Sequence, residues 1–116
     1  MCGIAGIAFF DDQRSVSIRT LQQMCDTIRH RGPDDEGLDV RDGVGIGMRR
    51  LSIIDVTGGH QPIYNEDGTV RVVYNGEIYN FKELRCRLQQ RGHVFRTNTD
   101  TEVIVHAYEE YGSDFP

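Results

Sequence analysis

The chain has 116 residues, of which 38% are hydrophobic and 27% charged, with a formal net charge of -5. This length fits one domain with a modest core. The acidic balance argues against a nucleic-acid partner, and no apolar run approaches the roughly 20 residues of a membrane span. The N-terminus lacks the basic and long apolar regions of a signal peptide. Three widely spaced cysteines suit free thiols, which favours the cytoplasm.

Residues 2–10 are the first predicted element, an apolar strand with glycines where a neighbouring segment approaches closely. A helix is expected next, from its N-cap Ser17 to about His30. Its apolar residues recur at helical spacing. Cys25 lies on that apolar face, so we expect it in the core without a chemical role.

Two hairpins are expected after this helix, with strands at 36–41, 44–54, 63–65 and 69–74. Asp42-Gly43 is the turn signal of the first hairpin. Glycines 43, 45 and 47 spell G-x-G-x-G, which also occurs in nucleotide-binding loops. Because they lie inside a strand pattern and no strand–helix–strand unit follows, we favour a strand here.

A second helix is predicted after residue 80. Asn80 and Glu83 have the spacing of a capping box. Gly92 stands where a left-handed residue ends a helix. A short strand is then expected at 94–96.

The last predicted helix begins near Thr99 or Asp100 and ends at Gly112. Strands in hairpins with helices between them predict an α+β fold. The expected buried face of the last helix consists of Val103, Ile104, Ala107, Tyr108 and Tyr111.

Cys2 is the first candidate for chemistry. If Met1 is removed, Cys2 carries a thiol and a free α-amine on one carbon. The amine has an ordinary pKa of roughly 8, close to the pH at which a general base works. Such an N-terminal nucleophile needs no histidine. The alternative is that Cys2 is a small hydrophobe that starts a buried strand.

Three polar stretches extend this candidate site. Arg50, after Arg49, ends a strand, where its guanidinium either grips a carboxylate or lies in solvent. Asn75 and the backbone N–H of Gly76 fit an oxyanion hole, although Asn-Gly is also a common turn. Asp100 either receives an ammonium group or caps a helix. Together they suit an α-amino acid with a side-chain amide.

Six motifs occur along the chain. They are Met-Cys-Gly-Ile-Ala-Gly at 1–6, Arg-His-Arg-Gly-Pro-Asp at 29–34, Arg-Leu-Ser-Ile-Ile-Asp at 50–55, Gln-Pro at 61–62, Asn-Gly-Glu-Ile-Tyr-Asn at 75–80 and Asp-Thr-Glu at 100–102. In sequence and order they resemble the glutaminase domain of class II (N-terminal nucleophile) glutamine amidotransferases of the asparagine synthetase type. The similarity runs from Cys2 to about Gly112. The motifs at 29–34 and 75–80 favour this type over the amidotransferases of hexosamine, purine or glutamate synthesis.

The resemblance implies an N-terminal nucleophile fold, an αββα four-layer sandwich, of which residues 1–116 would be the N-terminal portion. The expected activity is hydrolysis of L-glutamine to glutamate and ammonia. The ammonia would feed asparagine synthesis from aspartate and ATP in a C-terminal synthetase domain, which is absent here. The resemblance allows a homodimer of the full-length protein. We expect no metal in this domain, because the sequence contains no C-x-x-C, H-E-x-x-H or EF-hand motif. We expect no cofactor either, since ATP and magnesium would belong to the synthetase domain.

The resemblance also implies residue roles. Cys2 would attack the glutamine amide, with its own α-amine as base and later as acid. Arg50 would hold the substrate carboxylate with backbone groups near Ile53 and Ile54, Asn75 and Gly76 would form the oxyanion hole, and Glu77 and Asp100 would hold the substrate ammonium.

Three alternatives stay open at this point. The domain could serve an amidotransferase that aminates a different carboxylate, or a hydrolase of other amides. It could also be a truncated interaction module without catalysis, which loss of Cys2, Arg50, Asn75 or Asp100 would have favoured. Of the four histidines, only His30 is expected to support the site; the others are expected at structural or surface positions.

Overall fold

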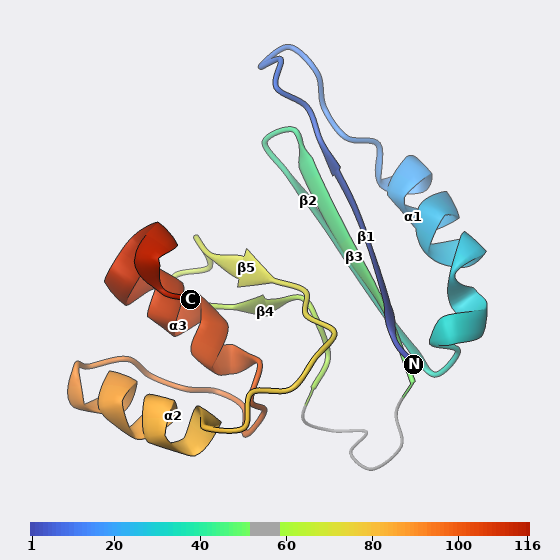
Figure 1. The fold of residues 1–116 in the computed structure, drawn as a ribbon. Coiled ribbons are helices and arrows are strands. Elements are labelled where there is room, and N and C mark those ends of the chain that lie inside the picture. The colour runs from blue at the N-terminus through green and yellow to red at the C-terminus, as the bar shows by residue number, and fades with distance from the viewer. Residues whose placement is uncertain (52–58) are drawn as a thin grey trace. The chain divides into compact units, whose positions relative to one another are not determined.

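The computed structural model describes residues 1–51 and 59–116, and its helices and strands confirm the α+β class. The chain forms two units (Figure 1). The first unit contains Met1–Pro62 and Val73–Asn75, and the second contains Ile63–Val72 and Gly76–Pro116. No helix in the described part of the chain is long and apolar enough to cross a membrane.

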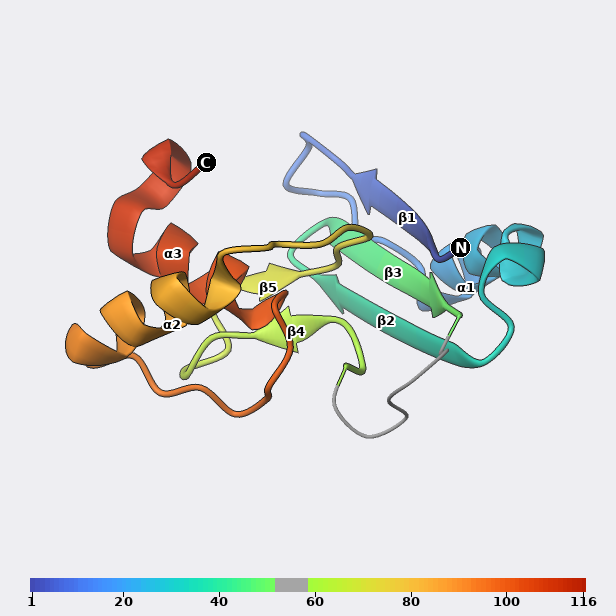
Figure 2. The same ribbon diagram turned by 60° about the horizontal axis from the view of Figure 1, so that its bottom comes forward.

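The first unit is built on a three-stranded antiparallel sheet of β1 (Gly3–Ala8), β2 (Asp35–Arg41) and β3 (Val44–Arg50). Figure 2 shows β3 between the other two strands. The predicted turn joins β2 to β3, with positive φ angles of 48° at Asp42 and 76° at Gly43. These angles are those that a two-residue hairpin loop requires.

Helix α1 (Ile18–Thr27) covers one face of this sheet. The helix approaches closely because the sheet presents glycines to it. A Cβ added at Gly45 would lie 3.2 Å from Leu21, and one at Gly47 would lie 2.5 Å from the sulfur of Cys25. Both α1 residues are fully buried. The placement of Cys25 in the core and of Gly45 and Gly47 in a strand is therefore confirmed, whereas Gly43 lies in the turn before β3.

The opposite face of the sheet carries a second segment of the same unit. A Cβ on Gly37 would lie 1.5 Å from the carbonyl oxygen of Gln61, so only glycine fits there. The buried amide of Gln61 donates from Nε2 to the carbonyl of Tyr74 (3.1 Å) and accepts at Oε1 from the N–H of Tyr74 (2.7 Å). This side chain thus fixes residues 73–75 as a neighbouring strand would.

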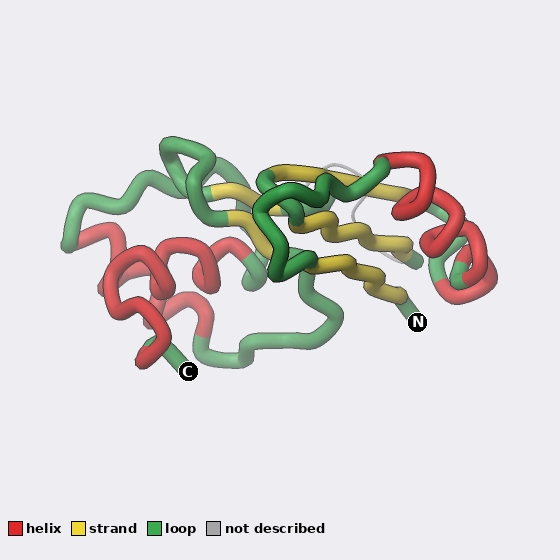
Figure 3. The backbone as a smooth tube through the Cα atoms, turned by 90° about the horizontal axis from the view of Figure 1, so that it is seen from above, coloured by secondary structure: helices red, strands yellow, loops and turns green. Residues whose placement is uncertain are grey.

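The second unit contains a two-stranded sheet and two helices. Figure 3 shows helices α2 (Phe81–Gln90) and α3 (Glu102–Tyr111) side by side. The hairpin of β4 (Ile63–Tyr64) and β5 (Arg71–Val72) packs against α3. A cluster of Leu88, Val103 and Ala107 forms the core of this unit.

Several helix predictions need correction. Helix α1 ends at Thr27 instead of near His30, and a 3₁₀ turn follows at Arg29–Arg31. Neither Ser17 nor Asn80 makes a side-chain capping hydrogen bond, although both stand at the N-cap. The backbone of Asn80 (φ −94°, ψ 21°) is not extended, whereas a capping side chain normally requires an extended N-cap.

The strand predicted at 94–96 is absent, because its backbone N–H groups donate to carboxylates instead of to a strand. Val94 donates to Glu66 at 2.7 Å, and Arg96 donates to Glu102 at 2.7 Å. The glycine end of the preceding helix is confirmed, with φ +97° at Gly92.

The buried face of α3 also differs from the prediction. Tyr108 and Tyr111 are 46% and 41% exposed, while Glu102, Val105 and His106 are buried. The helix contacts α2 on one side and the β4–β5 hairpin on another, so it buries more than a single stripe.

Candidate active site

Cys2 stands at the start of β1 and is held by three segments of the first unit. Its carbonyl oxygen accepts hydrogen bonds from Arg31 Nε and from Asn75 Nδ2, both at 3.2 Å. Its sulfur accepts from the backbone N–H of Leu51 at 3.5 Å. The side chain is half-buried. The residue predicted as nucleophile and the amide predicted as oxyanion donor are therefore in direct contact.

Arg31 holds the backbone of Cys2, a contact that the sequence did not predict. It belongs to the 29–34 motif, in which only His30 was expected to support the site, and His30 is exposed. A Cβ on the following Gly32 would lie 2.3 Å from the backbone of Arg49, so the turn that contains Gly32 packs directly against the end of β3. The signal that was available is an arginine placed directly before a Gly-Pro turn.

Arg49 is a structural residue. Its Nε donates to the carbonyl of Gly32 at 2.9 Å, and its Nη1 pairs with Glu36. The side chain is 7% exposed. Arg49 is therefore not a solvated strand end. It fastens the turn at Gly32 onto the sheet.

Arg50 follows on the other face of β3 and is half-buried. Its carbonyl accepts from the N–H of Asp34 at 3.1 Å. Its guanidinium lies against the backbone of Gly59, where an added Cβ would be 2.4 Å from Nη2 and 2.5 Å from Nη1. The predicted roles of Ile53 and Ile54 fall outside the described residues.

The second unit contains Gly76, Glu77 and Asp100. Asp100 Oδ2 accepts from the N–H of Ile78 at 2.7 Å, and Oδ1 accepts from the hydroxyl of Thr101 at 3.4 Å. Asp100 thus fastens the turn that follows Glu77, which is exposed. The roles of these three residues toward a substrate stay predictions.

Cys25 contrasts with Cys2. Burial raises the pKa of the Cys25 thiol above its ordinary value, the nearby carboxylate of Glu36 raises it further, and Arg49 offsets part of this. The thiol is therefore protonated at neutral pH, which suits a packing residue.

Comparison with known proteins identifies the class to which this site belongs. A family model described as the glutamine amidotransferase domain matches residues 1–116, and the chain belongs to that family. It is 50% identical, over 99% of its length, to asparagine synthetase [glutamine-hydrolyzing] 2 of Bacillus subtilis (strain 168), and 48% identical to asparagine synthetases of Sandersonia aurantiaca and Arabidopsis thaliana. The resemblance found in the sequence is thereby confirmed. The chain covers 15%, 22% and 19% of these three relatives, which are enzymes by name.

Proposed function

We propose that this chain hydrolyses L-glutamine to glutamate and ammonia through a thioester on Cys2. The observation that carries the proposal is the hydrogen bond from Asn75 to the carbonyl of Cys2, because these residues are 73 positions apart. A turn-forming Asn-Gly pair does not require that contact. A nucleophile and an oxyanion donor must lie close together, since both act on one carbonyl group, and this contact places Asn75 beside Cys2.

The mechanism begins with removal of Met1, which frees the α-amine of Cys2. This amine takes the thiol proton, and the sulfur attacks the amide carbon of glutamine. The tetrahedral intermediate collapses when the C–N bond breaks and the α-ammonium returns its proton to the leaving nitrogen, which departs as ammonia. Water then hydrolyses the thioester with the α-amine again as base.

The other predicted residues act on binding and charge. An asparagine amide has two N–H donors, so an Asn75 that keeps its bond to Cys2 still has a second N–H for the oxyanion. The backbone N–H of Gly76 would be the other donor. Each such donor is worth roughly 3 kcal/mol in the transition state. The guanidinium of Arg50 would bind the substrate carboxylate, and Glu77 and Asp100 would bind the ammonium group.

We extend the proposal to the longer protein. The names of the relatives support delivery of ammonia to asparagine synthesis, by a C-terminal synthetase part in which ATP and magnesium would act. Ile4 and Val44 are 53% and 36% exposed on the sheet face opposite α1. Exposed apolar side chains on this face are a reason to propose a second sheet packed against it, as in an αββα sandwich of which this chain would be the N-terminal portion. The free thiols support a cytoplasmic location.

Labelling by a diazo-ketone analogue of glutamine, followed by intact mass analysis, tests the proposal. We expect loss of Met1 and one adduct, mapped to Cys2. The Cys2→Ala variant should stay unlabelled, and Cys86→Ala, which changes an exposed cysteine, should label as the parent does. An unmodified Cys2 in the purified chain and in the longer protein would contradict the proposal and favour a non-catalytic module.

A further inference from the structure

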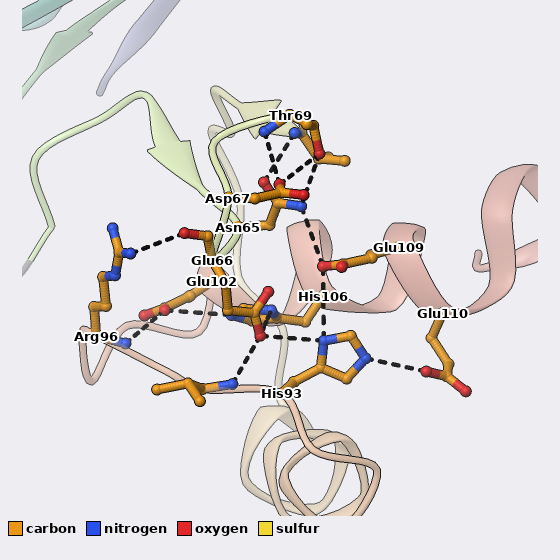
Figure 4. Close-up of polar contacts among 12 residues, drawn as sticks. Asn65, Glu66, Asp67, Thr69, His93, Arg96, Glu102, His106, Glu109 and Glu110 are labelled. Atoms are coloured by element: carbon orange, nitrogen blue, oxygen red, sulfur yellow. Dashed lines mark hydrogen bonds and ion pairs between the residues drawn. The ribbon is translucent and has the colours of Figure 1, made fainter.

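Four metal-ligating side chains converge in the second unit. They are Glu66 from the β4–β5 turn, His93 from the segment after α2, and His106 and Glu109 from α3 (Figure 4). One ligand atom from each lies within 4.8 Å of the other three. We propose that these four side chains bind one divalent cation of the Zn²⁺ type. This site goes beyond the proposed function and does not depend on it.

The separations between ligand atoms suit tetrahedral coordination. Zn²⁺ bound by nitrogen and oxygen at about 2.0–2.1 Å holds neighbouring ligand atoms about 3.4 Å apart. Glu66 Oε1 lies 3.3 Å from His106 Nδ1 and 3.4 Å from His93 Nδ1. His93 Nδ1 lies 3.7 Å from Glu109 Oε2. These three separations are thus close to the tetrahedral value, and the remaining ones are no longer than 4.8 Å.

His106 supplies an independent observation. Its side chain is 1% exposed, and among the described residues its Nδ1 has no hydrogen-bond partner. Burying an unsatisfied polar atom normally costs about 1–3 kcal/mol. Nδ1 lies 3.3 Å from Glu66 Oε1 without hydrogen-bond geometry. A cation among the four ligand atoms would satisfy this nitrogen directly.

The groups around the ligands are those that usually support a metal-bound histidine. His93 Nε2 lies 3.0 Å from Glu110 Oε2, and His106 Nε2 lies 3.4 Å from Glu102 Oε1. In metal sites the second ring nitrogen commonly donates to a carboxylate, which fixes the tautomer and leaves the first nitrogen free for the ion. Both histidines thus present Nδ1 to the centre for the same reason.

The carboxylate ligands are held as well. Glu66 accepts from the N–H of Val94 at 2.7 Å, and Glu109 accepts from Asn65 Nδ2 at 3.1 Å. These hydrogen bonds hold both carboxylates in place, as the partners of metal ligands commonly do.

A network of protonated histidines is the alternative account of this cluster. It explains the ion-pair distances but leaves His106 Nδ1 without a hydrogen bond. A divalent cation at the centre of the cluster explains both the short distances and the missing hydrogen bond of His106 Nδ1. The sequence predicted no metal because the ligands come from three separate segments; the one local signal is His106 and Glu109, one helical turn apart on α3.

Titration calorimetry of the chelator-treated protein with Zn²⁺ tests the site. We expect about one ion per chain, because His and carboxylate sites of this kind take one ion. The His106→Gln and Glu109→Gln variants should each bind at least tenfold more weakly, since even supporting residues of metal sites change affinity by about 10–100-fold. His60→Gln, which changes an exposed histidine of the first unit, should bind as the parent does.

Circular dichroism of each variant separates loss of a ligand from loss of fold. Glu109 is exposed, so its substitution should leave the fold intact even where that of His106 does not. With Co²⁺ in place of Zn²⁺, the parent should give the visible absorption of a tetrahedral ion. Absence of saturable binding in the folded parent, or binding that Glu109→Gln leaves unchanged, would overturn the inference.

Discussion

Gly59 has no side chain, and the guanidinium of Arg50 occupies the space where one would be. The Gly59→Ala variant should therefore displace the guanidinium, because the end of a flexible side chain moves more readily than backbone. If Arg50 binds the glutamine carboxylate, KM for glutamine should rise about tenfold or more, as for a weakened charged hydrogen bond of roughly 1.5–3 kcal/mol. Steady-state glutaminase assays measure this.

The matched control for that substitution is Gly6→Ala in β1, where a new methyl group would meet only the carbonyl of Gly45 at 3.4 Å. Its KM should be that of the parent. Equal KM values for parent and Gly59→Ala, with Arg50 displaced, would remove Arg50 from the carboxylate-binding role.

We expect Cys25 to make the folded protein less stable at alkaline pH. Its folded pKa is raised above the ordinary 9.0, so above that pH the unfolded chain releases the thiol proton while the folded chain keeps it. The unfolded state then binds fewer protons, and the free energy of unfolding falls as pH rises. Urea unfolding from neutral pH upward should show this decline in the parent and a smaller one in Cys25→Ala.

Cys86→Ala serves as the comparison, since Cys86 is exposed and should leave the alkaline decline unchanged. An identical pH dependence for the parent and Cys25→Ala would show that other groups cause the decline.

At the scale of elements, Gln61 joins the sheet face to residues 73–75. Gln61→Met keeps the length of the side chain and removes both hydrogen bonds to the Tyr74 backbone. We expect a loss of about 1–3 kcal/mol in the free energy of unfolding, as for two hydrogen bonds. Because Asn75 directly follows Tyr74, kcat for glutamine should fall too. Urea unfolding and glutaminase assays measure the two effects.

Gln23→Met is the control for this element, because Gln23 is exposed on α1. It should change neither stability nor kcat beyond about 0.5 kcal/mol. A stable Gln61→Met protein with normal kcat would mean that other contacts hold residues 73–75 in place.

Turns and helix ends that depend only on the residues at that position could be predicted from the sequence. The turn at Asp42 and the helix end at Gly92 follow from residues that accept positive φ. The strand predicted at 94–96 was wrong because the backbone donors there go to Glu66 and Glu102, which no local pattern indicates.

The residues of the candidate site differ in the same respect: some could be predicted from local sequence, and others depend on contacts with distant segments. Cys2 could be selected from its position alone, whereas Arg31 could not, because its role is a contact with the carbonyl of Cys2 across 29 positions. The buried His106 could likewise not be selected as a candidate metal ligand from the sequence. Its importance depends on Glu66, which a separate hairpin brings to α3.

At the scale of the whole molecule, each unit has its own apolar core. Leu88 is 1% exposed in the core of the second unit. Leu88→Ala should cost about 2–5 kcal/mol and should speed amide hydrogen exchange in α2 and α3 more than in β1–β3. Leu21→Ala should do the reverse. Equal acceleration everywhere, measured by mass spectrometry, would mean that the units unfold together.

The order of segments along the chain constrains how the protein is made on the ribosome. Residues Ile63–Val72 belong to the second unit but emerge before Val73–Asn75, which complete the first. The first unit therefore cannot finish folding until a piece of the second has left the exit tunnel, ahead of α2 and α3. After Met1, Cys2 is made before the rest of its unit, and Asn75 is the last residue of that unit. The contact between them can form only when translation of that whole unit has ended.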